Sequence, residues 1–351
     1  MKKWNGIIML ILCTVIFAGC TKESQKPDQK AQAESVQEQQ TETEEQKAES
    51  DEEDRTDINI AALKGPTAMG MVKVMEDAGN GEAMNNYQFQ IFGMADEISA
   101  GLAKGEIDIA AIPCNLASVL YNNTKGKVKV AGINTLSVLY ILETGDEIQT
   151  VEDLRGKTIY STGLGTTPQY TLNYLLKANG IDPEKDVTIE YKSEATEVAA
   201  LLSQTEDAIA MLPQPYVTTV MMNNDKARIA LDIGKEWGEV NDDESNVVTG
   251  VVVVRRDFLE KNPEAVKAFM KEYEASTTFV DDHVPEAAQL IEKFDIFKAG
   301  IAKKAIPYCN ITLIQGEEMK EKVNGYLDVL FQENPKSIGG ALPEDDFYYI
   351  E

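Results

Sequence analysis

The chain has 351 residues, 59 of them acidic and 33 basic, and its formal net charge at pH 7 is −26. A charge of this sign and size argues against binding to nucleic acid or to anionic membrane surfaces. The length allows about two domains, and the hydrophobic fraction of 43% is sufficient to fill their cores.

The N-terminus predicts a targeting segment. A basic start is followed by an apolar run over 7–17, which is short for a bilayer span, and then by Ala18, Gly19 and Cys20. Small residues before a cysteine resemble the bacterial lipobox, in which the cysteine receives lipid and becomes the mature N-terminus. We therefore expect a lipoprotein signal peptide over 1–19 and a lipid on Cys20 that anchors the protein to the cell membrane from outside the cytoplasm. A transmembrane anchor is the alternative.

The segment over 20–57 is rich in Glu, Gln, Lys, Ser and Asp and has almost no apolar side chains. Such a segment cannot bury enough surface to offset its ordering entropy, so we expect a disordered acidic tether. Of the other cysteines, Cys13 is lost with the signal peptide, while Cys114 and Cys309 remain in the mature chain. The sequence leaves open whether these two form a disulfide.

From Ile58 onward the sequence predicts strands and helices in alternation. The expected strands are 58–60, 87–92, 107–112, 127–132, 136–142, 157–160, 187–191, 207–212, 227–233 and 247–254, the last almost wholly β-branched and therefore buried. The expected helices are 68–78, 95–103, 116–120, 168–178, 195–203, 213–220, 264–281, 285–294 and 316–333. After residue 254 we expect helices only.

The stretch over 150–176 contains a strand, a glycine-bearing loop, and a helix that begins at Pro168 after two threonines, Thr166 and Thr167. Proline fits the first turn of a helix because its missing N–H has no partner there to lose. A flexible loop that opens a helix presents backbone N–H groups and the positive end of the helix dipole, which favours an anion or a polar ligand edge. An ordinary strand–turn–helix with a good N-cap is the alternative.

A second copy of this pattern lies 100 positions earlier, where Gly65 and Thr67 match Gly165 and Thr167. Further on, the offset holds without a gap over a whole helix and strand. The identities there are Glu97 with Glu197, Ala100 with Ala200, Leu102 with Leu202, Glu106 with Glu206, Ile109 with Ile209, Ala110 with Ala210 and Pro113 with Pro213. An internal repeat of this length predicts two similar α/β lobes.

The motifs KGPTAMG, DIAAIP, VEDLRGKTIYSTGLGTTP and LPQPY, together with the lipobox and the acidic tether, resemble ABC-transporter solute-binding lipoproteins of the NMT1/THI5-like and SsuA-like group. The resemblance covers essentially everything after Asp57. It implies a type II periplasmic-binding-protein fold, in which two Rossmann-like α/β lobes are joined by a two-strand hinge and C-terminal helices pack on lobe I. The implied boundaries are 58–143 and 246–351 for lobe I and 144–245 for lobe II, with crossings near 140–146 and 244–250.

The resemblance also implies a ligand site between the lobes, at the carboxyl ends of the strands, where ligands bind in open α/β sheets. The implied ligand-binding residues are Lys64, Gly65, Pro66, Thr67, Pro113, Cys114, Asn115, Asn134, Thr135, Gly163, Gly165, Thr166, Thr167, Gln214 and Tyr216. Each of them also fits a purely structural role at a turn or a helix start. Gln214 is neutral where relatives have an acidic residue, so Lys64 and the two helix N-termini favour an anionic or strongly polar ligand. Tyrosines such as Tyr216 could stack on a ring.

The implied function is that of the extracytoplasmic solute-binding subunit of an ABC importer, which captures a small polar or anionic molecule and delivers it to a permease and its ATPase. We expect a monomer with no enzymatic activity, no cofactor and no metal. The alternatives are a ligand-sensing lipoprotein that acts on a membrane receptor, and a THI5-like enzyme of pyrimidine biosynthesis. The single histidine, His283, is far in sequence from the loops above, and no dinucleotide fingerprint is present because Pro168 takes the place of its third glycine. The sequence does not identify the ligand.

Overall fold

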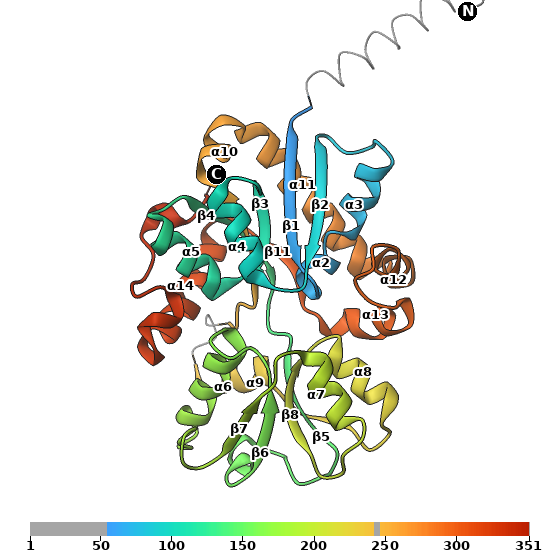
Figure 1. The fold of residues 1–351 in the computed structure, drawn as a ribbon, viewed down its shortest axis with the longest axis vertical. Helices are drawn as coiled ribbons and strands as arrows, with labels where there is room; N and C mark the ends of the chain where they lie inside the picture. Colours follow the sequence, from blue (N-terminus) through green and yellow to red (C-terminus); the bar gives the residue numbers. More distant parts are fainter. Residues whose placement is uncertain (1–54, 242–245, 351) are drawn as a thin grey trace, which may run out of the picture. The chain divides into compact units, whose positions relative to one another are not determined.

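The computed structural model describes residues 55–241 and 246–350. The expected signal peptide, the lipid anchor on Cys20 and nearly all of the tether lie outside these residues. The described part contains two mixed β-sheets, each covered by helices, and the sheets form the centres of two lobes (Figure 1). The expected class of fold, two α/β lobes, is confirmed.

The first sheet has six strands in the order β11-β4-β10-β3-β1-β2. Its strands are β1 (Asp57–Leu63), β2 (Asn86–Phe92), β3 (Ile109–Pro113), β4 (Val128–Thr135), β10 (Gly250–Arg255) and β11 (Ile311–Ile314). Strands β1, β2 and β3 are parallel, whereas β10 runs antiparallel to β3 and β4. Side chains of β10 alternate between two apolar cores, with Val251 and Val253 in one and Val252 and Val254 in the other. Burial on both faces explains the unbroken β-branched run.

The second sheet has five strands in the order β7-β6-β8-β5-β9, which repeats the arrangement of the first sheet without its β11 edge. Its strands are β5 (Leu139–Glu143), β6 (Thr158–Ser161), β7 (Thr188–Tyr191), β8 (Ile209–Pro213) and β9 (Arg228–Asp232). Strand β5 takes the place of β10 and is antiparallel to β8 and β9. Ile109 pairs with Ile60 in the first sheet, and Ile209 pairs with Ile159 in the second. Corresponding residues are therefore 100 positions apart in β3 and β8, but one position fewer in β1 and β6.

Helices flank both sheets (Figure 1). The first lobe carries α2 (Pro66–Met69), α3 (Val72–Gly79), α4 (Ala95–Lys104), α5 (Cys114–Thr124), α10 (Arg256–Lys261), α11 (Pro263–Asp282), α12 (Val284–Lys293), α13 (Ala299–Ala305) and α14 (Gly316–Glu333). The second lobe carries the 3₁₀ turn η1 (Val151–Leu154), α6 (Thr167–Ala178), α7 (Ala195–Leu202), α8 (Tyr216–Asn223) and α9 (Ile233–Val240). Helix α14 packs on α5 and β4 of the first lobe and also contacts α6 of the second.

The chain changes sheets earlier than the sequence indicates. Because β5 pairs with β8 and β9, the first crossing lies between Thr135 and Leu139, and not at the expected boundary of 143 or near 140–146. All five residues of β5 are buried, and in the sequence the run over 136–142 is typical of a single apolar strand, which does not reveal the crossing. The return crossing lies between α9 and β10, and the strand expected from Val247 begins only at Gly250.

The expectation of helices only after residue 254 is wrong. Strand β11 pairs with β4 at the edge of the first sheet. Its four residues form too short a run to be recognised as a strand between two helical segments. The single helix expected over 68–78 is also divided, into α2 and α3, with Gly70 and Met71 between them.

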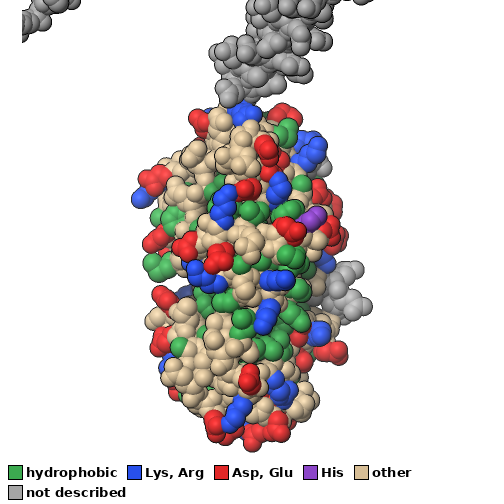
Figure 2. Space-filling view, turned by 90° about the vertical axis from the view of Figure 1, so that its right-hand side faces the viewer, with side chains coloured by type: hydrophobic (Ala, Val, Ile, Leu, Met, Phe, Trp, Pro, Cys, Tyr) green, Lys and Arg blue, Asp and Glu red, His purple; other side chains and the backbone are tan. Residues whose placement is uncertain are grey.

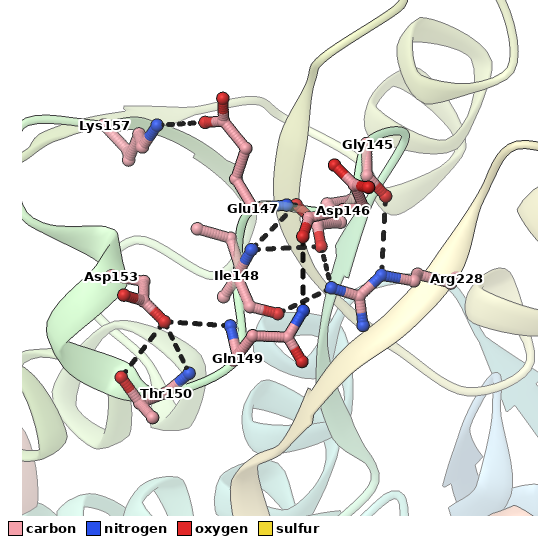
Figure 3. A network of polar contacts seen from close by, with 10 residues as sticks. Gly145, Asp146, Glu147, Ile148, Gln149, Thr150, Asp153, Lys157 and Arg228 are labelled. Carbon is pink, nitrogen blue, oxygen red and sulfur yellow. Dashed lines mark hydrogen bonds and ion pairs between the residues drawn. The ribbon is translucent and has the colours of Figure 1, made fainter.

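At the outer end of β5, the carboxylate of Glu143 holds the following loop in place. It is 2% exposed, forms an ion pair with Arg228, and accepts hydrogen bonds from the N–H groups of Glu147 (3.1 Å) and Ile148 (3.2 Å). Figure 3 shows that Arg228 also donates to the carbonyl oxygens of Gly145 (3.4 Å) and Ile148 (2.7 Å). A buried carboxylate is tolerated only when it is paired and hydrogen-bonded in this way.

Candidate ligand-binding site

The two lobes meet where the parallel strands of each sheet end. Thr167 Oγ1, at the start of α6, donates a hydrogen bond across the lobes to Asn115 Oδ1 (3.2 Å). The N–H of Gln214, directly after β8, donates to the carbonyl oxygen of Val138 in the first crossing (2.9 Å). Loops that are far apart in the sequence, and that the resemblance assigns to a ligand site, are thus brought together.

Four side-chain atoms at the crossings are buried and have no hydrogen-bond partner among the described residues. They are Oδ1 of Asn134 and the hydroxyl oxygens of Thr135, Ser137 and Thr249, and we refer to these four residues as the unpaired cluster. A buried polar atom without a partner costs about 1–3 kcal/mol, so such atoms are rare in a purely structural core. Their concentration at the crossings makes this the best candidate for direct contact with a ligand.

Gly250 allows the residues around the unpaired cluster to approach closely. A Cβ at this position would lie 2.5 Å from Asn134 Oδ1, 2.7 Å from Thr67 Cγ2 and 3.3 Å from Thr135 Cβ, which leaves no room for a side chain. Asn134 Nδ2 donates to Tyr273 OH (3.0 Å) and to the carbonyl oxygen of Thr67 (3.3 Å). Both amide donors are therefore used, and Oδ1 is left as an acceptor suited to an N–H or O–H group of a ligand.

Two N–H groups of the loop before α6, which the sequence predicts to be bare, have partners in the structure. The N–H of Gly165 donates to Gln169 Oε1 (2.7 Å). The N–H and the hydroxyl of Thr166 both donate to the carbonyl oxygen of Gly163 (3.0 and 2.9 Å). Gly163 and Gly165 have φ angles of +75° and +78°, and this left-handed turn directs the donors back onto the loop itself. Only Thr167 reaches across to the other lobe.

The remaining residues implied by the resemblance differ in exposure. Lys64 and Gly165 are exposed, Pro113 and Tyr216 are half-buried, and Gly65, Pro66, Thr67, Cys114, Asn115 and Gln214 are buried. Gln214 Oε1 accepts hydrogen bonds from the N–H (3.3 Å) and hydroxyl (2.8 Å) of Thr218, so it supports the first turn of α8. The ring of Tyr216 packs edge-on against Phe297 of the other lobe, with 5.4 Å between centroids. These contacts shape the site rather than offer free groups.

The two cysteines and the histidine are the residues that an enzymatic alternative would use. Cys114 and Cys309 are free and buried, and burial raises the pKa of both thiols. His283 is exposed, and its ring stacks on Phe279 with 4.9 Å between centroids. Within 55–241 and 246–350, no group of three or more His, Cys, Asp or Glu side chains could hold a metal ion. No helix in these ranges is long and apolar enough to cross a membrane.

Sequence reasoning missed Ser137 and Thr249, because both lie within the crossings and not after a parallel strand. Ser137 follows the predicted site residues Asn134 and Thr135 closely, whereas Thr249 directly precedes Gly250, which was not predicted. A small hydroxyl residue at the edge of a long apolar run is the signal that could have revealed them. Here those runs are 136–142 and 247–254.

A family model described as NMT1/THI5 like matches residues 128–288. No curated protein matches the chain. Among solved structures, an ABC transporter from Parabacteroides distasonis is 26% identical with a TM-score of 0.70, covering 84% of this chain and 99% of that one. The alkanesulfonate-binding protein SsuA from Xanthomonas axonopodis pv. citri, bound to MOPS, is 14% identical with a TM-score of 0.64, covering 84% and 98%. The periplasmic aliphatic sulphonate binding protein SsuA from Escherichia coli is 17% identical with a TM-score of 0.64, covering 81% and 90%.

The fold of this chain is that of the periplasmic binding proteins. The resemblance indicated by its motifs, to NMT1/THI5-like and SsuA-like binding proteins of ABC transporters, is confirmed. The similar structures named here include ligand-binding proteins and no enzyme. At their level of identity the two SsuA structures establish the fold and not the ligand.

Proposed function

We propose that this chain is the extracytoplasmic solute-binding subunit of an ABC importer, which holds a small polar molecule between its lobes and delivers it to a permease. The observation that carries the proposal is the unpaired cluster at the crossings between the lobes. A ligand that pairs with these four side chains recovers the free energy lost by burying them alone, about 1–3 kcal/mol for each. Contacts to both lobes exist only in the closed arrangement, so binding favours closure.

The deep part of the site favours a ligand with hydrogen-bonding groups rather than a full charge. We propose Asn134 and Thr135, from the residues implied by the resemblance, as direct ligand contacts, and we add Ser137 and Thr249. Thr167, also implied by the resemblance, supports binding through its bond to Asn115 when the lobes close. None of these five side chains is ionisable in the physiological range, and all are buried or nearly so. A full charge placed there would lose its hydration without gaining an opposite charge.

The test is a thermal-shift screen of the purified chain against a library of metabolites. A ligand present at 100 times its Kd stabilises a protein by about 2.7 kcal/mol, which is readily measured. Small-angle scattering should then show a more compact protein with the ligand than without it. If no compound of a broad library stabilises the chain, the proposal fails.

We also propose that the chain has no catalytic activity of its own. The free groups at the site are hydroxyls and an amide, which bind and orient but offer no placed acid–base or nucleophilic pair. The ligand should therefore be recovered chemically unchanged after long incubation. A transformed product that disappears in His283→Ala or Cys114→Ala would move the chain to the enzyme class.

The lipid anchor on Cys20 and a place outside the cytoplasm complete the proposal. They rest on the lipobox-like sequence and on the periplasmic binding protein named above, which shares the fold. Cys20→Ala should leave the precursor unprocessed while ligand binding is unchanged. Recovery of the variant in membranes as a lipidated species would rule out this anchor.

A further inference from the structure

The contacts between the lobes differ on the two sides of the molecule. On the side of α6, α9 and α14 the lobes are packed together by apolar and polar groups. Trp237 of α9 is fully buried, with its ring 5.5 Å from that of Tyr326 in α14, and Thr171 Oγ1 lies 2.9 Å from Tyr326 OH. Lys177 of α6 forms an ion pair with Glu333 of α14. These contacts join the two lobes directly on this side.

The side of α8 and α13 holds a groove of about 500 Å³ between the lobes. The groove is lined by Gln214, Thr218, Met221, Met222 and Ile229 from the second lobe and by Lys303, Lys304, Pro307 and Tyr308 from the first. Figure 2 views the molecule from this side and shows basic side chains beside apolar ones where the lobes meet. The side chains of Met221 and Met222 are 41% and 44% exposed, and that of Tyr308 is 50% exposed. The groove is therefore open to solvent and largely apolar on one wall.

Charge distinguishes this groove from the rest of the surface. Lys303 and Lys304 lie in the last turn of α13, are exposed, and form no ion pair with any described residue. No carboxylate is among the described residues that line the groove, although the chain has 59 acidic residues against 33 basic ones. Two unpaired cations beside an apolar wall are complementary to an anionic group on an apolar body.

The groove adjoins the unpaired cluster. Gln214 lines the groove and its N–H is bonded to Val138 in the first crossing. Asn310, two residues after Tyr308, donates its side-chain amide to the carbonyl oxygen of Ser137. Gln214 and Asn310 therefore link the neutral cluster to the groove, which places both at the same interface between the lobes.

We propose that Lys303 and Lys304 form an anion-binding subsite, which holds a carboxylate, sulfonate or phosphate group of a ligand whose polar end pairs with the unpaired cluster. The apolar middle of this ligand lies against Met221 and Met222, whose flexible thioethers adapt to its shape. The ligand is thus bipolar, with a neutral hydrogen-bonding end and an anionic end. This inference rests on the proposed binding function and specifies where the charge of the ligand is recognised.

The test uses the full chain and a panel of organic carboxylates, sulfonates and phosphomonoesters, each paired with its neutral amide or alcohol. Binding is measured by thermal shift and calorimetry for the wild type and for the double variant Lys303→Gln/Lys304→Gln. Lys298→Gln is the matched control, because Lys298 precedes the same helix and pairs with Glu292 (3.3 Å) outside the groove. Anionic probes should bind about tenfold more weakly to the double variant and unchanged to the control, and added salt should weaken only the wild-type interaction.

Two other results would overturn the inference, and they are distinguishable. If neutral members of the panel bind as well as their anions, or if the double variant retains wild-type affinity for anions, the anion subsite is excluded while the binding function stands. If neither this panel nor the metabolite library stabilises the wild type, the binding function itself fails and the subsite falls with it.

Discussion

The two lobes have the same arrangement of strands, but they differ at both ends of the antiparallel strand. That strand is β10 in the first sheet and β5 in the second. At the outer end each lobe pairs a buried carboxylate with an arginine, Asp108 with Arg255 (2.6 Å) in the first lobe and Glu143 with Arg228 in the second. The antiparallel strand supplies the arginine in β10 and the carboxylate in β5. Both lobes therefore have an ion pair at this end, but which strand carries the acidic residue and which the basic one differs between them.

At the inner ends, where the lobes meet, the difference is larger. The first lobe contributes Oδ1 of Asn134 and the hydroxyl oxygens of Thr135 and Thr249, which have no partner among the described residues. In the loop of the second lobe, the N–H of Gly165 donates to Gln169 and the hydroxyl of Thr166 donates to Gly163. The first lobe therefore offers most of the free hydrogen-bonding capacity, and the second lobe closes over it.

The largest expected effect separates the two outer ion pairs. Glu143→Gln removes the buried carboxylate that pairs with Arg228 and accepts the N–H groups of Glu147 and Ile148, and should destabilise the protein by about 3 kcal/mol, since hydrogen bonds to a charged group contribute about 1.5–3 kcal/mol. Asp108→Asn should cost less, about 2 kcal/mol, because Arg255 keeps a second carboxylate in Asp257. Urea unfolding of both variants measures the difference. Equal losses would show that the second carboxylate contributes nothing.

The next effect concerns the thiols, both of which lie in the first lobe. Burial raises the pKa of Cys114 and Cys309 above the ordinary value of 9.0, so the folded chain holds protons that the unfolded chain releases. Stability from this source is complete below pH 9 and is lost as the pH rises above it, by about 1.4 kcal/mol per thiol at pH 10. Unfolding at pH 8 and pH 10 should show a smaller loss in Cys114→Ala/Cys309→Ala than in the wild type. The same pH dependence in both proteins would contradict this assignment.

Removing the free hydroxyls should affect ligand affinity and not stability. Thr135→Val and Thr249→Val take away buried atoms without partners, so the free protein should be unchanged or about 1 kcal/mol more stable. Ligand affinity should fall about tenfold for each, because a hydrogen bond is lost in the complex. Thr144→Val is the matched control, since its buried hydroxyl donates to Thr205 (2.9 Å) far from the crossings and its loss should lower stability alone. Loss of stability without loss of affinity in Thr135→Val would exclude a ligand contact there.

The smallest effect distinguishes the matched threonines of the repeat. Thr67 Oγ1 donates within its own lobe to the carbonyl oxygen of Leu63 (2.5 Å), whereas Thr167 Oγ1 donates across the lobes to Asn115. Thr67→Val should therefore lower the melting temperature, with a loss of about 1 kcal/mol and unchanged affinity. Thr167→Val should leave the melting temperature nearly unchanged and weaken binding about fivefold, because its bond exists only when the lobes are closed. Identical behaviour of the two variants would remove the asymmetry between the lobes.

The sequence by itself determined the repeated order of strands and helices and the presence of two lobes. Local periodicity specified most elements, and helix α6 at Thr167–Ala178 and helix α14 at Gly316–Glu333 lie within a residue of their expected bounds. The offset of 100 specified the repeat, because identical residues at Ile109 and Ile209 occupy identical positions in two sheets. The resemblance to solute-binding proteins pointed to Asn134, Thr135 and Thr167, which fall at or after the carboxyl ends of predicted strands, where ligands bind in open α/β sheets.

Only the tertiary structure decided where the chain changes sheets and which polar groups stay free. The apolar run over 136–142 is equally compatible with either sheet, and pairing with β8 and β9 assigns β5 to the second. The sequence does not fix the hydrogen-bond partner of a hydroxyl or N–H group, because the partner depends on which groups folding brings close. Gly165 thus pairs with Gln169, whereas the hydroxyl of Thr135 has no partner among the described residues. Lys303 and Lys304 likewise line one groove with Met221 only because folding brings α13 and α8 together, which no local sequence pattern predicts.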